Sequence, residues 1–347
     1  MSAHVSYIIA SFNSAHLLPK VLASIRRQIY CQDNIEILCV DGGSTDTTRE
    51  IAQQYGARYI YNEKGDPIHA KIIGAQEAKG CYLIYLDHDE VIISDQSLQL
   101  KINAMKSHNT VYGVIGSGYH NPPNATGICS YINEFGDPFS FFIYRLSKLE
   151  KFFVPTLRER YGVISEDADT ILFDFTNGMS PIIELVAGGS MINGHYLRHK
   201  LADSPDPKTD LVQLFYLIMQ DEGQVVMVKN DPIEHHATVA FSAYLHKIMW
   251  RIKNNIFYKD KLGKSGYIGR LNYHGGLLKY KQILYFPYAF LVLPVLIDTI
   301  YLVLSRRDIR YTNHLILTYY TTCAIVWHTI RHMTGCRPIQ RNYDGTK

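Results

Sequence analysis

Short apolar runs alternate with stretches of helical spacing along the first third of the chain. Strand-like runs lie at 5–10, 35–40, 58–61 and 83–86, and apolar residues three or four apart mark helices at 17–28, 48–55 and 69–78. Such alternation of strand and helix predicts an α/β fold, a mostly parallel sheet with helices on both faces.

The region 118–188 is irregular and rich in aromatic residues, and strand-like runs at 170–175 and 181–187 stand at its end. It is either a packed insertion or a flap for an apolar or sugar-like ligand, since aromatic rings suit both surfaces. A helix at 211–219 and a strand at 225–228 follow.

The carboxyl-terminal third is far more apolar. The run 283–304 is long enough to cross roughly 30 Å of hydrocarbon, and 315–330 forms a second, shorter run. We expect a membrane-associated helical hairpin. Because Asp298 and two prolines interrupt the first run, a pair of buried helices in a soluble tail is the alternative, and re-entrant or interfacial helices stay open.

A further segment, 241–262, carries apolar residues at helical spacing with lysine and arginine elsewhere around it. The pattern favours a helix on a membrane surface over one packed on the domain itself. The expected organisation is a catalytic domain at 1–240, with halves at 1–117 and 118–240, then this interfacial helix, then the hairpin and tail at 263–347.

Composition narrows the class of partner. The 347 residues carry a net charge of +3 with only 19% charged residues, so nucleic acid is not an expected partner. The six scattered cysteines show no zinc spacing and fit a reducing compartment. The start lacks a basic segment followed by a long apolar one, so we expect no signal peptide.

The stretch 83–91 holds the main candidate chemistry. A buried strand ends in Asp87-His88-Asp89, and carboxylates at the carboxyl end of such a strand are placed to bind a ligand or a hard divalent cation. An ordinary acidic turn is the alternative. Neither a Gly-x-Gly-x-x-Gly nor a Gly-x-x-x-x-Gly-Lys loop is present, so phosphate would be held through a metal.

Four motifs in order carry a resemblance: Val5 to Asn13, Asp41-Gly-Gly-Ser-Thr-Asp-Thr-Thr, Ala70-Lys71 with Gly74 and Ala78-Lys-Gly, and Leu86-Asp-His-Asp. Together they resemble the signatures of family 2 glycosyltransferases of the GT-A fold. The resemblance implies inverting transfer of a sugar from a nucleoside diphosphate donor. Departures at Ala10, Gly42 and Ile72 leave the base and the sugar open.

The resemblance also implies roles for the donor side. Asp41 would hydrogen-bond the base, and Ala10, Phe12 and Asn13 would line its pocket. Lys71, Asp87 and His88 would lie near the donor, and Gly189, in the turn Gly188-Gly189-Ser190, would let the backbone approach the sugar. Asp89 would bind Mg²⁺ or Mn²⁺ together with a histidine, His236 in preference to its neighbour His235.

For the acceptor side, Asp210 stands where the family has its catalytic base, although it could equally be a helix N-cap. Asp203, Asp206 and Glu166 are the fallbacks. A Gln-x-x-Arg-Trp motif is absent, which favours single addition over processive synthesis.

The sequence thus predicts a metal-dependent transferase that moves one sugar onto a membrane-associated acceptor, a polyprenyl phosphate or lipid-linked glycan. Its catalytic domain would face the cytoplasm, in polysaccharide or glycolipid biosynthesis. The alternatives are a sugar nucleotidyltransferase and a noncatalytic membrane scaffold; a homo-oligomer is left open.

Overall fold

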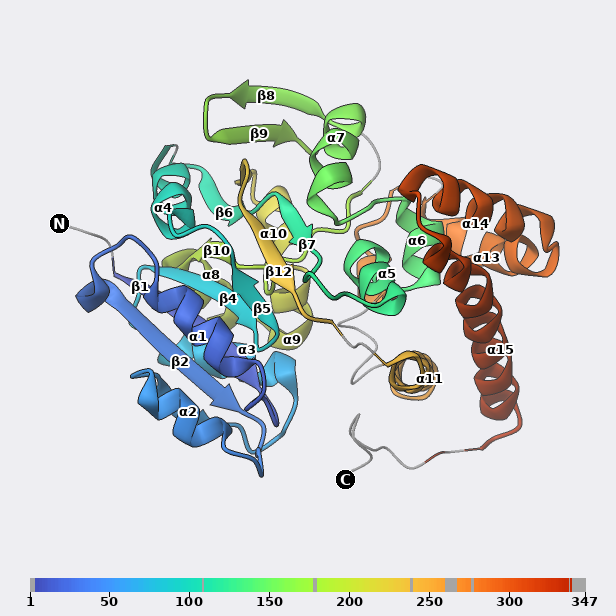
Figure 1. The fold of residues 1–347 in the computed structure, drawn as a ribbon, viewed down its shortest axis with the longest axis horizontal. Coiled ribbons are helices and arrows are strands. Elements are labelled where there is room, and N and C mark those ends of the chain that lie inside the picture. Colours follow the sequence, from blue (N-terminus) through green and yellow to red (C-terminus); the bar gives the residue numbers. More distant parts are fainter. Residues whose placement is uncertain are drawn as a thin grey trace. The chain divides into compact units, whose positions relative to one another are not determined.

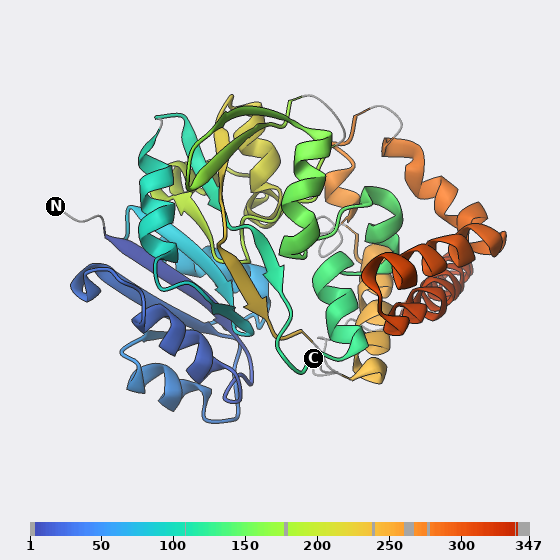
Figure 2. The same ribbon diagram turned by 45° about the horizontal axis from the view of Figure 1, so that its top comes forward.

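The chain folds into two compact units. The computed structural model describes residues 4–107, 109–176, 180–237, 240–259, 267–275, 278–336 and 338. The sheet unit comprises Met1–His120, Glu150–Gly178 and Ile183–His235, and the helical unit comprises Asn121–Leu149, Met179–Ile182 and His236–Lys347 (Figures 1 and 2). The boundary predicted at residue 240 therefore needs correction, because 121–149 folds with the carboxyl-terminal helices.

A nine-stranded sheet in the order β3-β2-β1-β4-β10-β6-β11-β9-β8 forms the centre of the sheet unit. The strands β3, β2, β1 and β4 run parallel, and β10 pairs antiparallel with β4 and β6. The strands of this sheet are β1 (Val5–Ser11), β2 (Ile35–Asp41), β3 (Arg58–Tyr61), β4 (Tyr82–Asp87), β6 (Val111–Ile115), β8 (Gly162–Glu166), β9 (Thr170–Asp174), β10 (Ser190–Asn193) and β11 (Gln224–Val228).

A second, three-stranded sheet has the order β5-β12-β7. It contains β5 (Glu90–Ile92), β7 (Gly118–His120) and β12 (Pro232–His235). Only two residues, His88 and Asp89, separate the end of β4 from the start of β5, so this small sheet starts at the carboxyl end of β4. The predicted α/β fold is confirmed.

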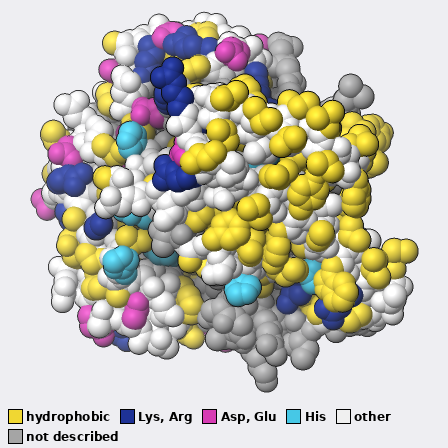
Figure 3. Space-filling view, turned by 45° about the vertical axis from the view of Figure 1, so that its right-hand side comes forward, with side chains coloured by type: hydrophobic (Ala, Val, Ile, Leu, Met, Phe, Trp, Pro, Cys, Tyr) yellow, Lys and Arg dark blue, Asp and Glu magenta, His cyan; other side chains and the backbone are white. Residues whose placement is uncertain are grey.

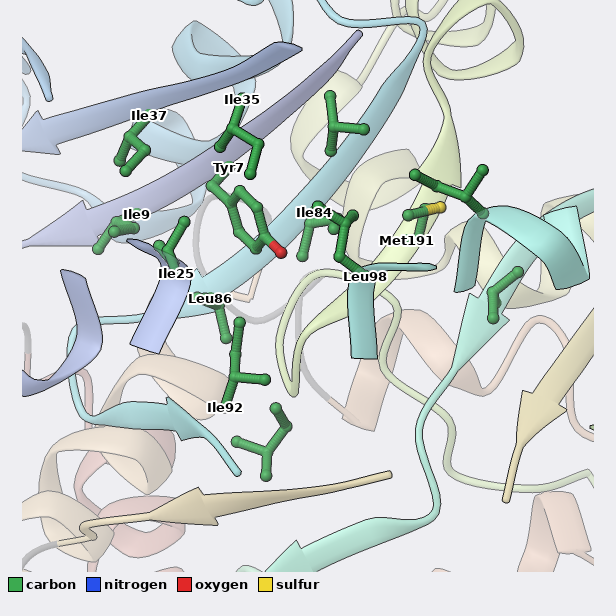
Figure 4. Close-up of a cluster of buried hydrophobic side chains, with 14 of the residues drawn as sticks. Tyr7, Ile9, Ile25, Ile35, Ile37, Ile84, Leu86, Ile92, Leu98 and Met191 are labelled. Carbon is green, nitrogen blue, oxygen red and sulfur yellow. The ribbon is translucent and has the colours of Figure 1, made fainter. Parts of the chain in front are cut away.

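Helices cover the sheet on both faces. Along β1 and β4, alternate residues such as Tyr7 and Ile84 turn toward Ile25 and Leu98 of the helices α1 and α4 (Figure 4). On the other face Gly74 packs so closely that an added Cβ would lie 2.2 Å from Ile8. The helices of this unit are α1 (Leu18–Arg26), α2 (Thr48–Gln54), α3 (Pro67–Glu77), α4 (Ser97–Ser107), α7 (Glu150–Arg160), α8 (Gly194–Ala202), α9 (Pro207–Val212) and α10 (Leu214–Gln220), with a short 3-10 helix at Gln32–Asn34.

One sequence prediction fails in the middle of the chain. The run 181–187 forms no strand, although its apolar residues are buried, and the strand β10 begins only at Ser190. The aromatic region, irregular by sequence, contains the three helices α5 (Gly127–Phe135), α6 (Pro138–Tyr144) and α7, and the first two belong to the helical unit.

The helical unit contains α5 (Gly127–Phe135), α6 (Pro138–Tyr144), α11 (Phe241–Phe257), α12 (Tyr267–Arg270), α13 (Leu278–Phe290), α14 (Leu293–Arg306) and α15 (Asn313–Met333), with a short 3-10 helix at Ile309–Thr312. Tyr131 of α5, Phe141 of α6, Tyr244 of α11 and Leu317 of α15 meet in one buried cluster. The apolar side of α11, assigned to a membrane surface by sequence, is therefore covered by protein. Residues 260–262 of that prediction lie outside the described range.

The observed carboxyl-terminal helices also differ from the predicted hairpin. The run 283–304 is divided between α13 and α14, whose axes bend by 91° at a short break. Within the described residues no single helix is both long and apolar enough to cross a membrane, and only this bent pair meets the criteria of length and composition.

Candidate active site

The candidate site is built at the carboxyl end of β4. Asp87 is the last residue of β4 and pairs with Ala10 at the end of β1, while His88 and Asp89 form the turn that leads into β5. All three residues of the motif, Asp87, His88 and Asp89, are half-buried. The carboxyl ends of parallel strands are where ligands of open α/β sheets bind, so the predicted carboxylates lie at the expected edge.

Lys71 does not stand alone near this edge, because it forms an ion pair with Asp87. Its Nζ lies 2.6 Å from Asp87 Oδ1 and donates to the carbonyl oxygen of Val186 at 2.6 Å. Burial lowers the pKa of Lys71, but the charge and hydrogen bond of Asp87 outweigh it, so the pKa is raised. The lysine is thus a buried, permanent cation that orients Asp87.

Glu90, which sequence reasoning missed, connects the parts of this site. Its buried carboxylate accepts hydrogen bonds from the backbone nitrogens of Asp87 and Gly188 and from the hydroxyl of Tyr119. Burial, and then the charge of Asp87, raise its pKa to about 7 while His235 opposes them. The sequence did contain an indication of this burial. Alternate residues of a strand face the same side, so Glu90 lies on the same buried face as Ile92.

The histidine beside Asp89 is His235. Its Nε2 lies 3.6 Å from Asp89 Oδ2, and its ring lies 4.9 Å from that of Tyr119. The register of β12 on β5 sets His235 opposite Glu90 and beside Asp89. This geometry favours His235, the alternative left open by the sequence, over His236. Burial lowers the pKa of His235, but the hydrogen bond to Asp89 and the nearby carboxylates outweigh it, so the pKa is raised.

The chemistry of this pair fits a divalent cation that shares its ligands with a substrate. Among the described residues no cluster of three or more His, Cys, Asp or Glu side chains is arranged to hold a metal alone. Mg²⁺ and similar ions are commonly bound by one or two protein ligands plus substrate phosphates. Asp89 and His235 supply two such ligands, so a metal here would need a phosphate-bearing partner to complete its shell.

The carboxylate of Asp41 forms all its hydrogen bonds within the protein. Its Oδ1 accepts from the hydroxyls of Ser11 and Ser44, and its Oδ2 accepts from the backbone nitrogens of Gly43 and Ser44 and from the Tyr59 hydroxyl. The side chain is completely buried. A carboxylate has about four acceptor positions, so this network uses its whole capacity. Asp41 shapes the loop that begins at residue 42.

Asn13 and Phe12 lie where that loop meets the end of β1. Asn13 has a φ of +46°. Its side-chain Oδ1 accepts a hydrogen bond from the backbone nitrogen of Thr45 at 2.9 Å, and its backbone nitrogen donates to Ser44 Oγ at 2.7 Å. Phe12 is 38% exposed, with a ring carbon 3.6 Å from the Cβ position of Gly42. An exposed ring held at a strand end is a surface on which a flat ligand can stack.

The turn at Gly188 and Gly189 adjoins the acidic edge. Both residues have positive φ, and an added Cβ on Gly189 would lie 2.9 Å from Ile233 Cδ1. The nitrogen of Gly189 donates to the carbonyl oxygen of Tyr85 in β4 at 3.0 Å. Glycine is required here for conformation and for space. The approach of Gly189 to a donor sugar stays a prediction.

Asp210 lies within α9 and does not cap it. The N-cap is Asp206, so the helix begins earlier than predicted, and Asp210 instead accepts from the Ser204 hydroxyl at 2.5 Å. The ion pair of Lys208 with Asp66, the N-cap of α3, ties α9 to the helix that carries Lys71. Asp210 is therefore free of the capping role that competed with its role as a base.

The fallback residues are less suited to proton transfer. Glu166 lies on the exposed strand β8, where hydrogen bonds from Arg158 and Lys229 lower its pKa to about 2. Asp203 is a largely exposed C-cap of α8, and Asp206 is engaged as an N-cap. A carboxylate held so strongly ionised as Glu166 is a poor base.

Part of the chain matches a known family of proteins. Residues 6–154, less than half of the chain, match the family model described as Glycosyl transferase family 2. This range is thus similar to the glycosyltransferases of family 2, which supports the predicted GT-A type of α/β fold. The predicted class of enzyme, glycosyltransferase, is confirmed at the level of this range.

Curated relatives match over about a third of the chain. An uncharacterized glycosyltransferase of Rickettsia prowazekii is 33% identical over 117 residues, 33% of this chain and 36% of the relative. A cholesterol galactosyltransferase of Borreliella burgdorferi is 34% identical over 111 residues, 30% of each. The chain thus spans about a third of the length of such relatives.

Among solved structures, the mannosyltransferase PcManGT from Pyrobaculum calidifontis, in complex with GDP-Man and Mn²⁺, is 12% identical with a TM-score of 0.49. The alignment covers 95% of this chain and 88% of that one.

Proposed function

We propose that this chain transfers one sugar from a nucleoside diphosphate sugar, in the presence of Mg²⁺ or Mn²⁺, to a membrane-associated acceptor such as a polyprenyl phosphate or a lipid-linked glycan. The observation that carries the proposal is the adjacency, at the end of β4, of the Lys71–Asp87 ion pair and the Asp89–His235 pair. The similarity of residues 6–154 to family 2 supports the reaction class.

Each residue then has a distinct task. Asp89 and His235 would hold the cation, which when bound neutralises charge on the departing diphosphate. Asp87, fixed by Lys71, would accept hydrogen bonds from sugar or ribose hydroxyls, and Phe12 would stack on the base. Asp210 would take the proton of the acceptor hydroxyl as that hydroxyl attacks the anomeric carbon in an inverting displacement.

The acceptor and the location belong to the same proposal. Transfer at a cytoplasmic membrane face suits a donor made in the cytoplasm and an acceptor held in lipid. The similarity of part of the chain to a cholesterol galactosyltransferase supports an acceptor of lipid character.

The test is binding and turnover of a panel of UDP-, GDP- and dTDP-sugars with Mn²⁺, with Mg²⁺ and with EDTA. We expect one donor to bind only with metal. His235→Gln should weaken metal-dependent binding by at least about tenfold, whereas the adjacent His236→Gln should not. Equal loss in both variants would contradict the ligand assignment, and metal-independent binding would contradict the metal.

The base is tested separately. Asp210→Asn should keep donor affinity while removing transfer, and Asp203→Asn, an exposed carboxylate nearby in sequence, should leave both unchanged. Normal transfer by the Asp210 variant would exclude it as the base. A folded protein that binds no donor of the panel would favour the noncatalytic scaffold.

A further inference from the structure

The outer face of the helices α13 and α14 is apolar over most of its length. Side chains more than half exposed include Ile283, Phe290, Leu291, Leu293, Ile297 and Leu304, which we call the wedge face. In Figure 3 hydrophobic side chains gather densely over this part of the helical unit. Most of the exposed large apolar residues in the described part of the chain lie between 280 and 333.

The side of these helices that is turned inward carries the polar groups. Asp298 of α14 lies 2.6 Å from Arg145 and accepts from the Tyr288 hydroxyl at 2.8 Å. His314 of α15 is buried between the hydroxyls of Tyr131 and Tyr288, at 2.6 and 3.0 Å. Asp298, the residue that interrupts the apolar run in the sequence, thus points into the unit and leaves the wedge face without charge.

In α15, too, polar groups are buried and apolar ones exposed. Together with Leu317 and Ala324 the helix buries His314, Thr318, Thr321, Thr322 and His328, whereas Ile316, Trp327, Ile330 and Met333 are exposed. Helices in water bury their apolar side and expose the polar one. A helical unit that holds its ionisable groups and threonine hydroxyls inside, beside an apolar cluster, and leaves isoleucine, leucine and phenylalanine outside has the polarity expected where the surrounding medium is lipid.

The shape of the wedge face limits how deeply it can enter a lipid bilayer. The helices α13 and α14 contain 13 and 14 residues, each roughly 20 Å long, against roughly 30 Å of hydrocarbon in a bilayer. They meet at 91°, and the break between them exposes Phe290, Leu291, Val292 and Leu293 together. An apolar bend between two short helices can enter one leaflet without a helix crossing the bilayer.

Basic residues stand at both ends of the apolar stretch. Lys279 precedes it and Arg307 follows it, and both side chains are exposed. Such cations suit the phosphate level of a membrane that contains anionic lipid.

We propose that the wedge face inserts into a single leaflet of an anionic phospholipid bilayer, so that the chain is held at the membrane as a monotopic protein. Of the arrangements that the sequence left open for the predicted membrane-associated hairpin, the proposal selects one that does not span the bilayer, and it assigns the membrane contact to α13 and α14 without α11. It rests on the helical unit alone and is independent of the transfer reaction proposed for the sheet unit.

The test is flotation of the full chain with vesicles of phosphatidylcholine alone and with one quarter phosphatidylglycerol. We expect binding to both and tighter binding to the anionic vesicles. Leu291→Glu with Leu293→Glu should lower the partition coefficient by at least about tenfold, because charges would have to enter hydrocarbon. The control pair Ile29→Glu with Ile164→Glu, equally exposed but in the sheet unit, should bind as the wild type does.

The basic residues and the depth are tested in the same system. Lys279→Glu with Arg307→Glu should remove the preference for anionic vesicles and keep binding to phosphatidylcholine. A nitroxide at position 291, in a chain whose exposed Cys31 and Cys323 are replaced by alanine, should report a depth below the phosphates but within one leaflet, less than roughly 15 Å.

Three results would overturn the proposal. The first is equal loss of binding in the wedge and control pairs. The second is a nitroxide located at or beyond the bilayer midplane, which would mean spanning. The third is failure of the wild type to bind vesicles together with a dimer in solution that Leu291→Glu and Leu293→Glu dissociate, which would make a second copy the occupant of the wedge face. Donor turnover by the wedge variants separates failure here from failure of the proposed reaction.

Discussion

The backbone nitrogen of Gly188 donates to both carboxylate oxygens of Glu90, at 2.9 and 2.8 Å. This contact joins the acidic end of β4 to the double-glycine turn, almost a hundred positions later in the chain. Because Glu90 also accepts from Asp87 and Tyr119, one buried side chain fixes the separation of the parts that would bind donor and metal.

Replacement of Glu90 should therefore disturb both stability and binding. Glu90→Ala leaves several buried donors without acceptors, and we expect a loss of about 3 kcal/mol in the free energy of unfolding. Tyr119→Phe removes one donor and keeps the ring, so it should cost about 1 kcal/mol. Urea unfolding measures both; a Glu90 variant as stable as the wild type would contradict the connecting role.

Lys71 should act on the donor through Asp87. If so, the effects of Lys71→Met and Asp87→Asn on donor affinity should not add, and the double variant should bind no worse than the weaker single variant. Calorimetric titration with the donor identified in the panel gives the binding free energies for this double-mutant cycle. Additive losses would show instead that Lys71 contacts the donor independently, as the family resemblance implied.

The occupied carboxylate of Asp41 leads to a third prediction. Asp41→Asn places an amide where backbone nitrogens of Gly43 and Ser44 donate, so it should cost about 2 kcal/mol of stability. Ser44→Ala, which removes one partner, should reproduce part of that loss. If the Asp41 variant had normal stability and a changed preference among nucleotide bases, the result would support instead the direct hydrogen bond of Asp41 to the base.

The helical unit should lose stability in acid. Burial lowers the pKa of His314 to about 3, against roughly 6.5 in an unfolded chain, while the charges of Asp298 and Arg145 act in opposite senses. The folded form holds His314 neutral, so its contribution is complete above pH 6.5 and is lost as the pH falls toward 3. By pH 5 this amounts to about 2 kcal/mol, at about 1.4 kcal/mol per pH unit.

The measurement is urea unfolding of the wild type and of His314→Gln at pH 7.5 and pH 5.0. The variant should show a smaller difference between the two pH values, because glutamine does not titrate. Equal differences would mean that the acid sensitivity arises elsewhere, for example at His274, whose pKa burial also lowers, to about 4.

Some candidate site residues were predicted from the sequence because their signal is local. A strand that ends in acids, or a glycine pair before a strand, is legible in a few consecutive positions, as at Asp87 and Gly189. Glu90 was missed because its importance lies in partners at 119 and 188. The sequence left His235 and His236 both open for the same reason, since only the pairing of β12 with β5 fixes which histidine lies beside Asp89.

The order of strands and helices, the acidic end of β4 and the apolar character of 283–304 were determined by the sequence itself, because period and composition are properties of neighbouring residues. Only the tertiary structure decided that Lys71 neutralises Asp87, that Asp41 is satisfied by its own loop, and that Asp298 turns inward toward Arg145. Each depends on groups brought together from distant positions by strand register and helix packing, which no local pattern encodes.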